Sequence, residues 1–517
     1  MPDKLFDTSI FRAPQMYAQY VGVEYRKRKR GVSIGEEDDK NCDYIFSKPP
    51  QQSNYRTVFS CDRDRILYSE AFQRLALKTQ VFRAGDDDRL RTRLTHTLEV
   101  SQIARTISTA LGLDNDLVEA IALGHDVGHT PFGHAGERVL HKFSMEMLEN
   151  TKPPKQVEAV ASTWGNTNGF KHNQQSVRVL ADFSNGIRLT NFCMYGIRNH
   201  SKLCWGKQGA KNDPDSKSVE FYSFYDEHCA YEDSTGQRHQ AWSVEAYIVY
   251  WADEIAQRHH DIEDAYKCNL LSRKEICECV DQCITFCRDS NHPIEDMCRV
   301  AEKLAILKTK NDESFVKFLS SLVVDTYVTC FIEEIRECLK KMSEGIESRE
   351  DFIEKYLSFD ENDVRKRLTE CDKGKPIGYF DKLFRDKLIR MIVPSFEVQR
   401  QDGKGEFIIR KLVSAYITNP QQLPDQAVER VFKKELPRYF KKGDYDQFFR
   451  AKKIDDTHLP RNTNLWSIID CRSVLQKGWE ESVTYNLLYP LVFRSIFDYV
   501  ASMTDSFALS EYSKLYG

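Results

Sequence analysis

The sequence predicts an all-α fold, because apolar residues recur at helical spacing along most of the chain, with few interruptions after about residue 60. The segment 91–111 carries one such stripe, formed by Leu94, Leu98, Ile103, Ile107 and Leu111. Residues 115–126 repeat this spacing, and a third long helix is expected over 243–265. We therefore expect a helical core, a second helical lobe, and a C-terminal helix that packs back on the core.

The first predicted segment is a charged arm over residues 1–45. Arg26 to Arg30 form a run of five basic residues, and four acidic residues follow at 36–39. Adjacent blocks of opposite charge are typical of a solvated segment that pairs with itself or with a neighbouring subunit. A weak contact of the basic run with single-stranded nucleic acid or a nucleotide is the second interpretation.

The predicted core follows over residues 46–270. An Asp-Asn-Asp cluster at 114–116 can cap the helix over 115–126, and Gly128 then interrupts the helical pattern before a helix that begins near Gly133. Residues from about 205 to 240 are rich in Gly, Lys, Asp, Ser and Gln, so this range is expected to be a surface insertion.

Two segments complete the predicted organisation. Residues 271–475 are expected to form a helical lobe of unassigned role, interrupted by a β-prone run at 406–412. The segment 476–517 contains an amphipathic, aromatic-rich pattern from Ser482 to Tyr516. This pattern predicts the helix that returns to the core.

Composition narrows the class of protein. Lys and Arg number 74 against 78 acidic residues, and the net charge of −4 argues against a surface built wholly for nucleic acid. No stretch approaches the ~20 consecutive apolar residues of a membrane span, and residues 1–7 show no apolar signal core. We therefore expect a cytoplasmic protein without a membrane partner, whose 15 cysteines are reduced thiols serving as small apolar residues.

Histidines and aspartates within the apolar helices form a candidate metal site. His125 and Asp126 are adjacent at the end of a predicted helix, and His96 comes from the preceding one. Asp253, within the apolar stretch 246–256, is a candidate fourth ligand. Two imidazoles and two carboxylates favour one divalent ion, such as Mn, Mg or Fe, over a closed structural zinc. The alternative for each residue taken alone is a hydrogen-bonded core histidine or a capping aspartate.

His134 and Glu137 form a candidate catalytic pair. They are three residues apart, so they lie on one face of a helix, about one turn apart. A carboxylate in that position can orient an imidazole that transfers protons to or from water or a leaving group. The alternative is that Glu137 is an ordinary acidic residue favoured in the first turn by the helix dipole.

Several motifs in this order resemble the dGTPase family of deoxynucleoside triphosphate triphosphohydrolases, within the HD phosphohydrolase superfamily. The matching segments are Leu77-Lys78-Thr79-Gln80-Val81-Phe82, Arg91 to Val100, Gly124 to His134, His172-Asn173-Gln174 and Asp498 to Asp505. The pair His125-Asp126 alone is a weak signal, whereas the ordered set is specific. The matches lie within 55–265 and 494–517, a little under half of the chain.

The resemblance implies a role for each matched residue. His96, His125, Asp126 and Asp253 would hold the metal, and His134 with Glu137 would be the catalytic dyad. The remaining matched residues would bind substrate: His129 and His172 near the triphosphate, Arg93 on the phosphates, and Gln80 and Asp261 on the deoxyribose 3′-hydroxyl. One residue departs from the family pattern, since Gln257 stands where the family usually has a tyrosine near the sugar and phosphates. This puts the packing of the sugar in doubt.

The function implied is metal-dependent hydrolysis of dGTP or several dNTPs to deoxynucleoside and inorganic triphosphate, by water attack at the α-phosphorus. The resemblance also implies a homo-oligomer, with a hexamer as one plausible size, and nucleotide effectors bound between subunits. Three alternatives stay open: an HD phosphohydrolase acting on monophosphates or signalling nucleotides, a protein that binds or cleaves nucleic acid, and a regulator with a silent site.

Overall fold

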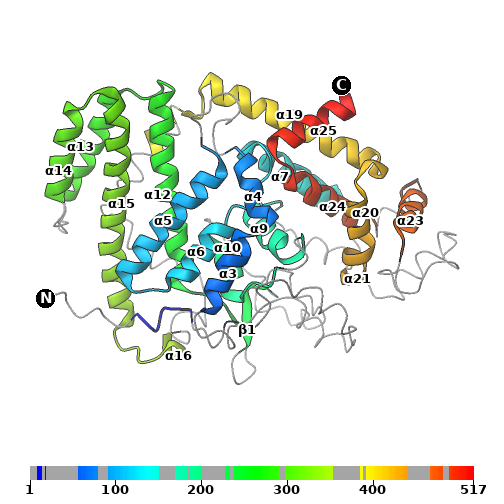
Figure 1. The fold of residues 1–517 in the computed structure, drawn as a ribbon, viewed down its shortest axis with the longest axis horizontal. Helices are drawn as coiled ribbons and strands as arrows, with labels where there is room; N and C mark the ends of the chain where they lie inside the picture. The colour runs from blue at the N-terminus through cyan, green and yellow to red at the C-terminus, as the bar shows by residue number, and fades with distance from the viewer. Residues whose placement is uncertain are drawn as a thin grey trace.

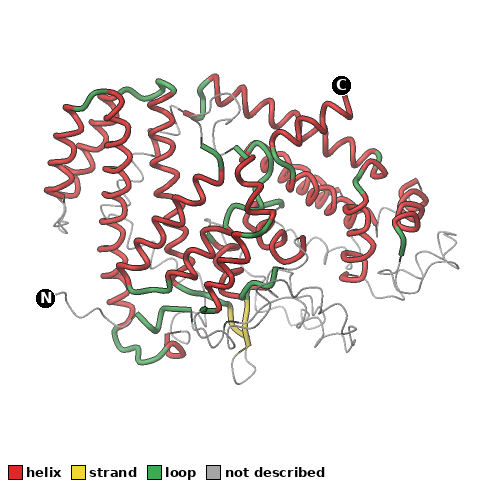
Figure 2. The backbone as a smooth tube through the Cα atoms, viewed as in Figure 1, coloured by secondary structure: helices red, strands yellow, loops and turns green. Residues whose placement is uncertain are grey.

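The chain is described here from a computed structural model, which covers residues 8–13, 18, 56–79, 91–150, 169–183, 187–200, 228–232, 238–289, 297–352, 385–387, 390, 392–439, 466–480 and 488–517. Helices dominate these residues, and the strands among them are β1 (Ala230–Glu232) and β2 (Arg238–Gln240), which pair antiparallel (Figure 2). The predicted all-α class is confirmed.

Helices from the first half of the chain surround the candidate site. They are α3 (Val58–Leu67), α5 (Arg93–Leu111), α6 (Asn115–Gly124), α9 (His172–Arg178), α10 (Asn191–Asn199) and α12 (Val244–Lys267). Helix α5 packs against both α6 and α12, and α6 packs against α3 and α10 (Figure 1). Three residues of the apolar stripe predicted for 91–111 support this packing, since Ile103, Ile107 and Leu111 are buried. Leu98 was also placed in the stripe but is 49% exposed, so the buried face is narrower than predicted. The predicted cap is present as well, because the Asp114 side chain accepts a hydrogen bond from the backbone N–H of Leu117.

A second group of helices continues from the middle of the chain. Helices α13 (Arg273–Asp289), α14 (Met297–Thr309) and α15 (Asp312–Ser343) stack in order, and α15 lies along α12 (Figure 1). The short helix α16 (Arg349–Phe352) follows, and its Phe352 ring meets Phe11 at a centroid distance of 5.1 Å. Buried side chains of these helices belong to the same hydrophobic cluster as α5, α6 and α12.

A second hydrophobic cluster joins α7 (Gly133–Asn150) to helices late in the sequence. These are α19 (Phe396–Thr418), α20 (Asp425–Arg430), α21 (Leu436–Tyr439), α23 (Ile468–Glu480), α24 (Leu488–Ser502) and α25 (Asp505–Tyr516). The first cluster continues along the chain to Val398, and the second contains the helices from α19 onward together with α7. The boundary expected between residues 270 and 271 stays a prediction. Helix α7, which carries the predicted catalytic pair, belongs to the second cluster through Val139 and Leu140.

One expectation was wrong in this part of the fold. The β-prone run 406–412 lies inside helix α19, where Ile408, Ile409 and Leu412 are buried. Their spacing also fits a helical stripe, and packing against α7 and α24 decides in favour of the helix. Most of the predicted surface insertion lies outside the described residues, and two of its described residues, Cys229 and Tyr231, are buried in the first cluster.

The C-terminal segment contacts the core through buried polar residues. The Asp498 carboxylate on α24 accepts hydrogen bonds from the Arg178 guanidinium on α9, at 2.7 Å and 2.9 Å from Oδ2. Asp505 accepts from the backbone N–H of Thr79 at 3.1 Å and of Phe132 at 2.9 Å. The tail thereby holds the loop that precedes His134. It forms two helices, because Thr504 caps a new helix after α24 ends.

None of the described helices combines the length and the apolar character needed to cross a membrane.

Candidate metal and catalytic site

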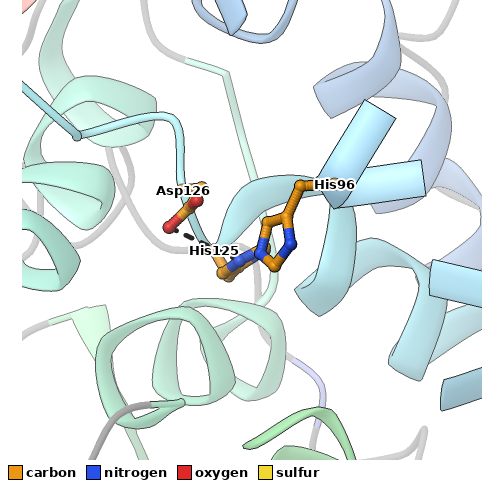
Figure 3. Close-up of side chains that lie close together, drawn as sticks. All are labelled: His96, His125 and Asp126. Atoms are coloured by element: carbon orange, nitrogen blue, oxygen red, sulfur yellow. Dashed lines mark ion pairs between the residues drawn. The ribbon is translucent and has the colours of Figure 1, made fainter. Parts of the chain in front are cut away.

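The predicted metal ligands lie together where α5 meets the end of α6. His125 directly follows α6 and Asp126 comes next, while His96 projects from the first turn of α5 toward them (Figure 3). All three side chains are buried, and one ligand atom from each lies within 4.8 Å of the others. Buried imidazoles and carboxylates cost free energy unless they are paired, so their convergence here points to a bound cation.

The hydrogen bonding of His125 leaves one ring nitrogen available to a metal. Nδ1 lies 2.6 Å from the carbonyl oxygen of Ala122, so Nδ1–H donates to it and Nε2 keeps its lone pair. Nε2 is buried and has no hydrogen-bond partner among the described residues. It lies 3.4 Å from Asp126 Oδ1 and 3.7 Å from Asp253 Oδ1. An unpartnered nitrogen facing two carboxylates fits a divalent cation between them.

Asp253 lies on α12 and completes the predicted set. Its Oδ1 is 2.9 Å from His96 Nε2. Burial raises the pKa of Asp253, but its contacts with the imidazoles of His96 and His125 outweigh burial and hold this pKa below its ordinary value. The pKa of Asp126 is likewise held well below its ordinary value, because nearby positive charges outweigh its burial. Both carboxylates are therefore ionised at neutral pH, as metal ligands must be.

Arg93 lies behind Asp126. Its Nη1 donates to Asp126 Oδ2 at 2.6 Å, and both side chains are almost fully buried. The structure thus gives Arg93 a contact that the sequence did not predict, with the carboxylate of a candidate ligand. Its Nε and Nη2 have no hydrogen-bond partner among the described residues. The contact with substrate phosphates implied by the family resemblance stays a prediction.

Glu137 contacts two histidines. Its Oε2 lies 3.0 Å from His172 Nδ1 and 3.4 Å from His134 Nδ1, and its Oε1 accepts from the backbone N–H of His172 at 3.2 Å. Glu137 is buried, whereas the side chain of His134 is 58% exposed. Burial raises the pKa of Glu137, but the histidine charges and hydrogen bonds hold it well below its ordinary value. The sequence predicted the contact with His134 but not the one with His172.

His129 lies between the candidate metal ligands and the cluster of His134, Glu137 and His172. Its Nε2 is 3.3 Å from Asp126 Oδ1, and its ring stacks on that of His172 with centroids 3.8 Å apart. Burial and the charge of Arg93 hold the pKa of His129 well below its ordinary value. Burial also lowers the pKa of His172, but Glu137 outweighs this effect and raises it. His129 is therefore neutral, and His172 is the ring of the pair that more readily carries charge.

Of the other two residues implied to bind substrate, the structure describes Asp261 but not Gln80. Asp261 is half-buried on α12, and burial raises its pKa to about 7. Gln257, at the position where the family usually has tyrosine, is half-buried on the same helix. Gln80 lies outside the described residues.

Two residues that the sequence did not single out, His260 and Glu99, extend from His96: His260 contacts it, and Glu99 contacts His260. His260 Nδ1 lies 3.3 Å from His96 Nδ1, and His260 Nε2 forms a short hydrogen bond with the Glu99 carboxylate. Their spacing carried a signal, since Glu99 follows His96 by three residues and His260 follows Asp253 by seven. Each pair thus lies on one helical face.

A separate cavity of about 370 Å³ lies beside the site rather than in it. Its walls come from α4 (Glu70–Gln73), α20, α24 and the neighbouring turns, and they include Lys78, Val127 and Tyr499. No predicted ligand or catalytic residue lines this cavity.

The chain is similar in sequence to a known domain family and to several known proteins. A family model described as the HD domain matches residues 93–258, a span that contains the four predicted ligands and the candidate dyad. A deoxyguanosinetriphosphate triphosphohydrolase-like protein of Caulobacter sp. (strain K31) is 29% identical over 386 residues, covering 73% of this chain and 83% of the relative. A protein of the same name from Ruegeria sp. (strain TM1040) is 35% identical over 269 residues, covering 51% and 57%. Another, from Caulobacter vibrioides, is 40% identical over 234 residues, covering 44% and 51%. Residues 93–258 therefore match the HD domain, and the chain is similar to the deoxyguanosinetriphosphate triphosphohydrolase-like proteins.

Proposed function

We propose that the chain hydrolyses dGTP, or several dNTPs, to a deoxynucleoside and inorganic triphosphate. One observation carries the proposal: the candidate ligand group of His96, His125 and Asp126 is linked to the buried carboxylate of Glu137 through two rings. His129 contacts Asp126 and stacks on His172, and His172 contacts Glu137. The name that the relatives share supports the substrate class, because it specifies deoxyguanosine triphosphate.

The residues fit one divalent metal ion, such as Mn, Mg or Fe. His96, His125, Asp126 and Asp253 would hold it, with the unpartnered Nε2 of His125 as one donor. When bound, such an ion supplies Lewis acidity that polarises a phosphate oxygen and lowers the pKa of attacking water. The mixed nitrogen and oxygen donor set is typical of catalytic ions that keep open positions for water or substrate.

The proton transfers fall to His134 and Glu137. Water attacks the α-phosphorus and the Pα–O5′ bond breaks, so the water oxygen remains in triphosphate and O5′ needs a proton. Glu137 accepts from Nδ1–H of His134 and thereby leaves Nε2 of this exposed ring to exchange protons with the reacting groups. His172, whose pKa is raised by Glu137, would place positive charge near the triphosphate.

The remaining assignments complete the proposal. The unpartnered Nε and Nη2 of Arg93 would bind phosphate oxygens, and Asp261 with Gln80 would bind the 3′-hydroxyl. We further propose a cytoplasmic homo-oligomer with nucleotide effectors between subunits, on the strength of the family resemblance. Light scattering with and without nucleotides tests the assembly, and an unchanging monomeric mass would contradict it.

A product assay tests the reaction. The purified protein is incubated with Mn²⁺ or Mg²⁺ and each dNTP, singly and in mixtures, and the products are separated by ion-exchange chromatography. Deoxynucleoside with intact triphosphate is expected, and loss of this product in Asp126→Ala and His134→Ala would locate the site. Diphosphates or monophosphates as products, or no product under any mixture, would contradict the proposal.

A further inference from the structure

A chain of hydrogen bonds runs from the surface of the core to the candidate metal site. It starts at the Glu99 carboxylate, which is 38% exposed on α5, and reaches Nε2 of the buried His260 on α12. Nδ1 of His260 lies 3.3 Å from Nδ1 of His96. The other nitrogen of His96, Nε2, faces Asp253 at 2.9 Å. Three side chains from two helices thus form a continuous path that ends at a candidate ligand.

The chemistry of the groups fixes the direction of these hydrogen bonds. An ionised carboxylate can only accept, so His260 Nε2 carries a hydrogen and donates to Glu99. Nδ1 of a neutral His260 is then an acceptor, and Nδ1 of His96 must donate to it. Nε2 of His96 consequently holds the lone pair, and this nitrogen is the one directed toward the other ligands.

We propose that Glu99 and His260 are positioning residues that hold His96 in the tautomer and orientation needed for metal binding. This inference rests on the metal site of the proposed function, and extends it to two residues outside the ligand set. His125 also has its hydrogen on Nδ1 and its lone pair on Nε2, because its Nδ1–H donates to the carbonyl oxygen of Ala122. Each candidate imidazole ligand therefore has its own acceptor for Nδ1–H, as metal-bound histidines generally require.

The same residues could be read as a second metal site, since Glu99, His259 and His260 each offer a ligand atom within 4.8 Å of the others. Nδ1 of His259 is buried without a hydrogen-bond partner among the described residues, which favours that reading. The guanidinium of Arg91 opposes it, because Arg91 Nε lies 3.6 Å from Glu99 Oε1 and Arg91 Nη2 forms an ion pair with Glu263. A fixed cation at this distance repels a divalent ion, so the structure favours the hydrogen-bond chain.

Metal affinity, measured without substrate, tests the proposal. The full-length protein is stripped of metal, and Mn²⁺ binding is titrated calorimetrically for the wild type and three variants. His260→Ala removes the acceptor for His96 and is expected to weaken binding by about 10- to 100-fold. His260→Asn places a carbonyl oxygen near the former position of Nδ1 and is expected to restore affinity to within about threefold of wild type. His259→Ala is the matched control on the same helix and is expected to bind as wild type does.

Thermal unfolding of each metal-free variant checks that the fold is retained. A second pair of variants, Glu99→Leu and Glu99→Gln, repeats the affinity comparison at Glu99, where the hydrogen-bond path begins. Glu99→Gln keeps an acceptor oxygen and is expected to bind more tightly than Glu99→Leu. Wild-type affinity in His260→Ala, or equal losses in His259→Ala and His260→Ala, would overturn the proposal. Two ions per wild-type chain, with one lost in both His259→Ala and His260→Ala, would also overturn it. If the wild type binds Mn²⁺ but yields no triphosphate from dNTPs, the proposed function fails while this inference stands.

Discussion

Replacing Gly128 by alanine should separate the two parts of the candidate site. Gly128 follows the His125-Asp126 pair, and its N–H donates to Ser176 Oγ on α9 at 2.9 Å. A Cβ atom at this position would lie 2.1 Å from the backbone nitrogen of Ser176 and 2.4 Å from the carbonyl oxygen of His172. Both obstacles are backbone atoms, so no side-chain rotation relieves the overlap. The sequence suggested only that Gly128 interrupts a helix, whereas the structure shows a close approach of two backbones.

The size of the effect follows from these distances. An ordinary contact of at least 3.4 Å requires α9 to move by about 1.3 Å relative to the loop. Overpacking of this kind typically costs about 1–3 kcal/mol, and the rigid backbone places Gly128→Ala at about 3 kcal/mol or more. The same movement carries His172 away from Glu137 and His129. A misplacement of about 1 Å in a catalytic group can cost about 100-fold in rate.

Chemical denaturation and the dNTP product assay measure the two consequences separately. Gly403→Ala is the matched control, because Gly403 lies within α19 and an added Cβ meets nothing within 4 Å. The free energy of unfolding of this control is expected to rise by about 0.5–1 kcal/mol, because alanine has a higher helix propensity than glycine, and its activity is expected to be unchanged. A Gly128→Ala variant with stability within about 0.5 kcal/mol of wild type and an unchanged kcat would refute the reasoning.

Three further predictions concern the C-terminal segment, pH and metal. Asp505→Ala removes the acceptor for the backbone N–H groups of Thr79 and Phe132, so unfolding should require about 2–4 kcal/mol less and kcat should fall; an unchanged melting temperature would argue against this link. Burial raises the pKa of Asp62 from its ordinary value of 3.8 to about 7, so its contribution to stability is complete below 3.8 and is lost as pH rises through 7. The melting temperature of Asp62→Asn relative to wild type should therefore increase between pH 5 and pH 8, and a constant difference would show that Asp62 does not titrate in this range. Chelation by EDTA should lower the melting temperature, and Mn²⁺ at a hundred times its Kd should restore about 2.7 kcal/mol; no response to either would contradict a metal bound only by the folded state.

The parts of the fold that could be predicted from the sequence are those set by local periodicity. The apolar stripe of α5 and the Asp114 cap of α6 are local signals, and the structure contains the cap and the part of the stripe from Ile103 to Leu111. The prediction of β structure for 406–412 was wrong because these residues suit a strand or a helix equally well. Only their contacts with α7 and α24 decide in favour of the helix. Cys229 is buried by distant helices, which a polar local composition could not reveal.

In the candidate site, too, the sequence predicted the local features and missed those that depend on contacts between distant residues. His125 and Asp126 are neighbours in sequence, so their convergence is a local matter, and the helical spacing of His134 and Glu137 is too. The contact of Glu137 with His172 joins residues 35 apart across two helices, and no spacing rule predicts it. Arg93 was assigned to phosphates by resemblance and by the affinity of a guanidinium for phosphate oxygens. Its ion pair with Asp126 depends on how α5 meets the end of α6.

The most direct test of the central claim follows the oxygen of the attacking water. The protein is incubated with dGTP and Mn²⁺ in ¹⁸O-labelled water, and both products are analysed by mass spectrometry. Attack at the α-phosphorus predicts one ¹⁸O atom in the triphosphate and none in the deoxyguanosine. Label in the deoxyguanosine, or label in a mono- or diphosphate instead of triphosphate, would contradict the proposed reaction.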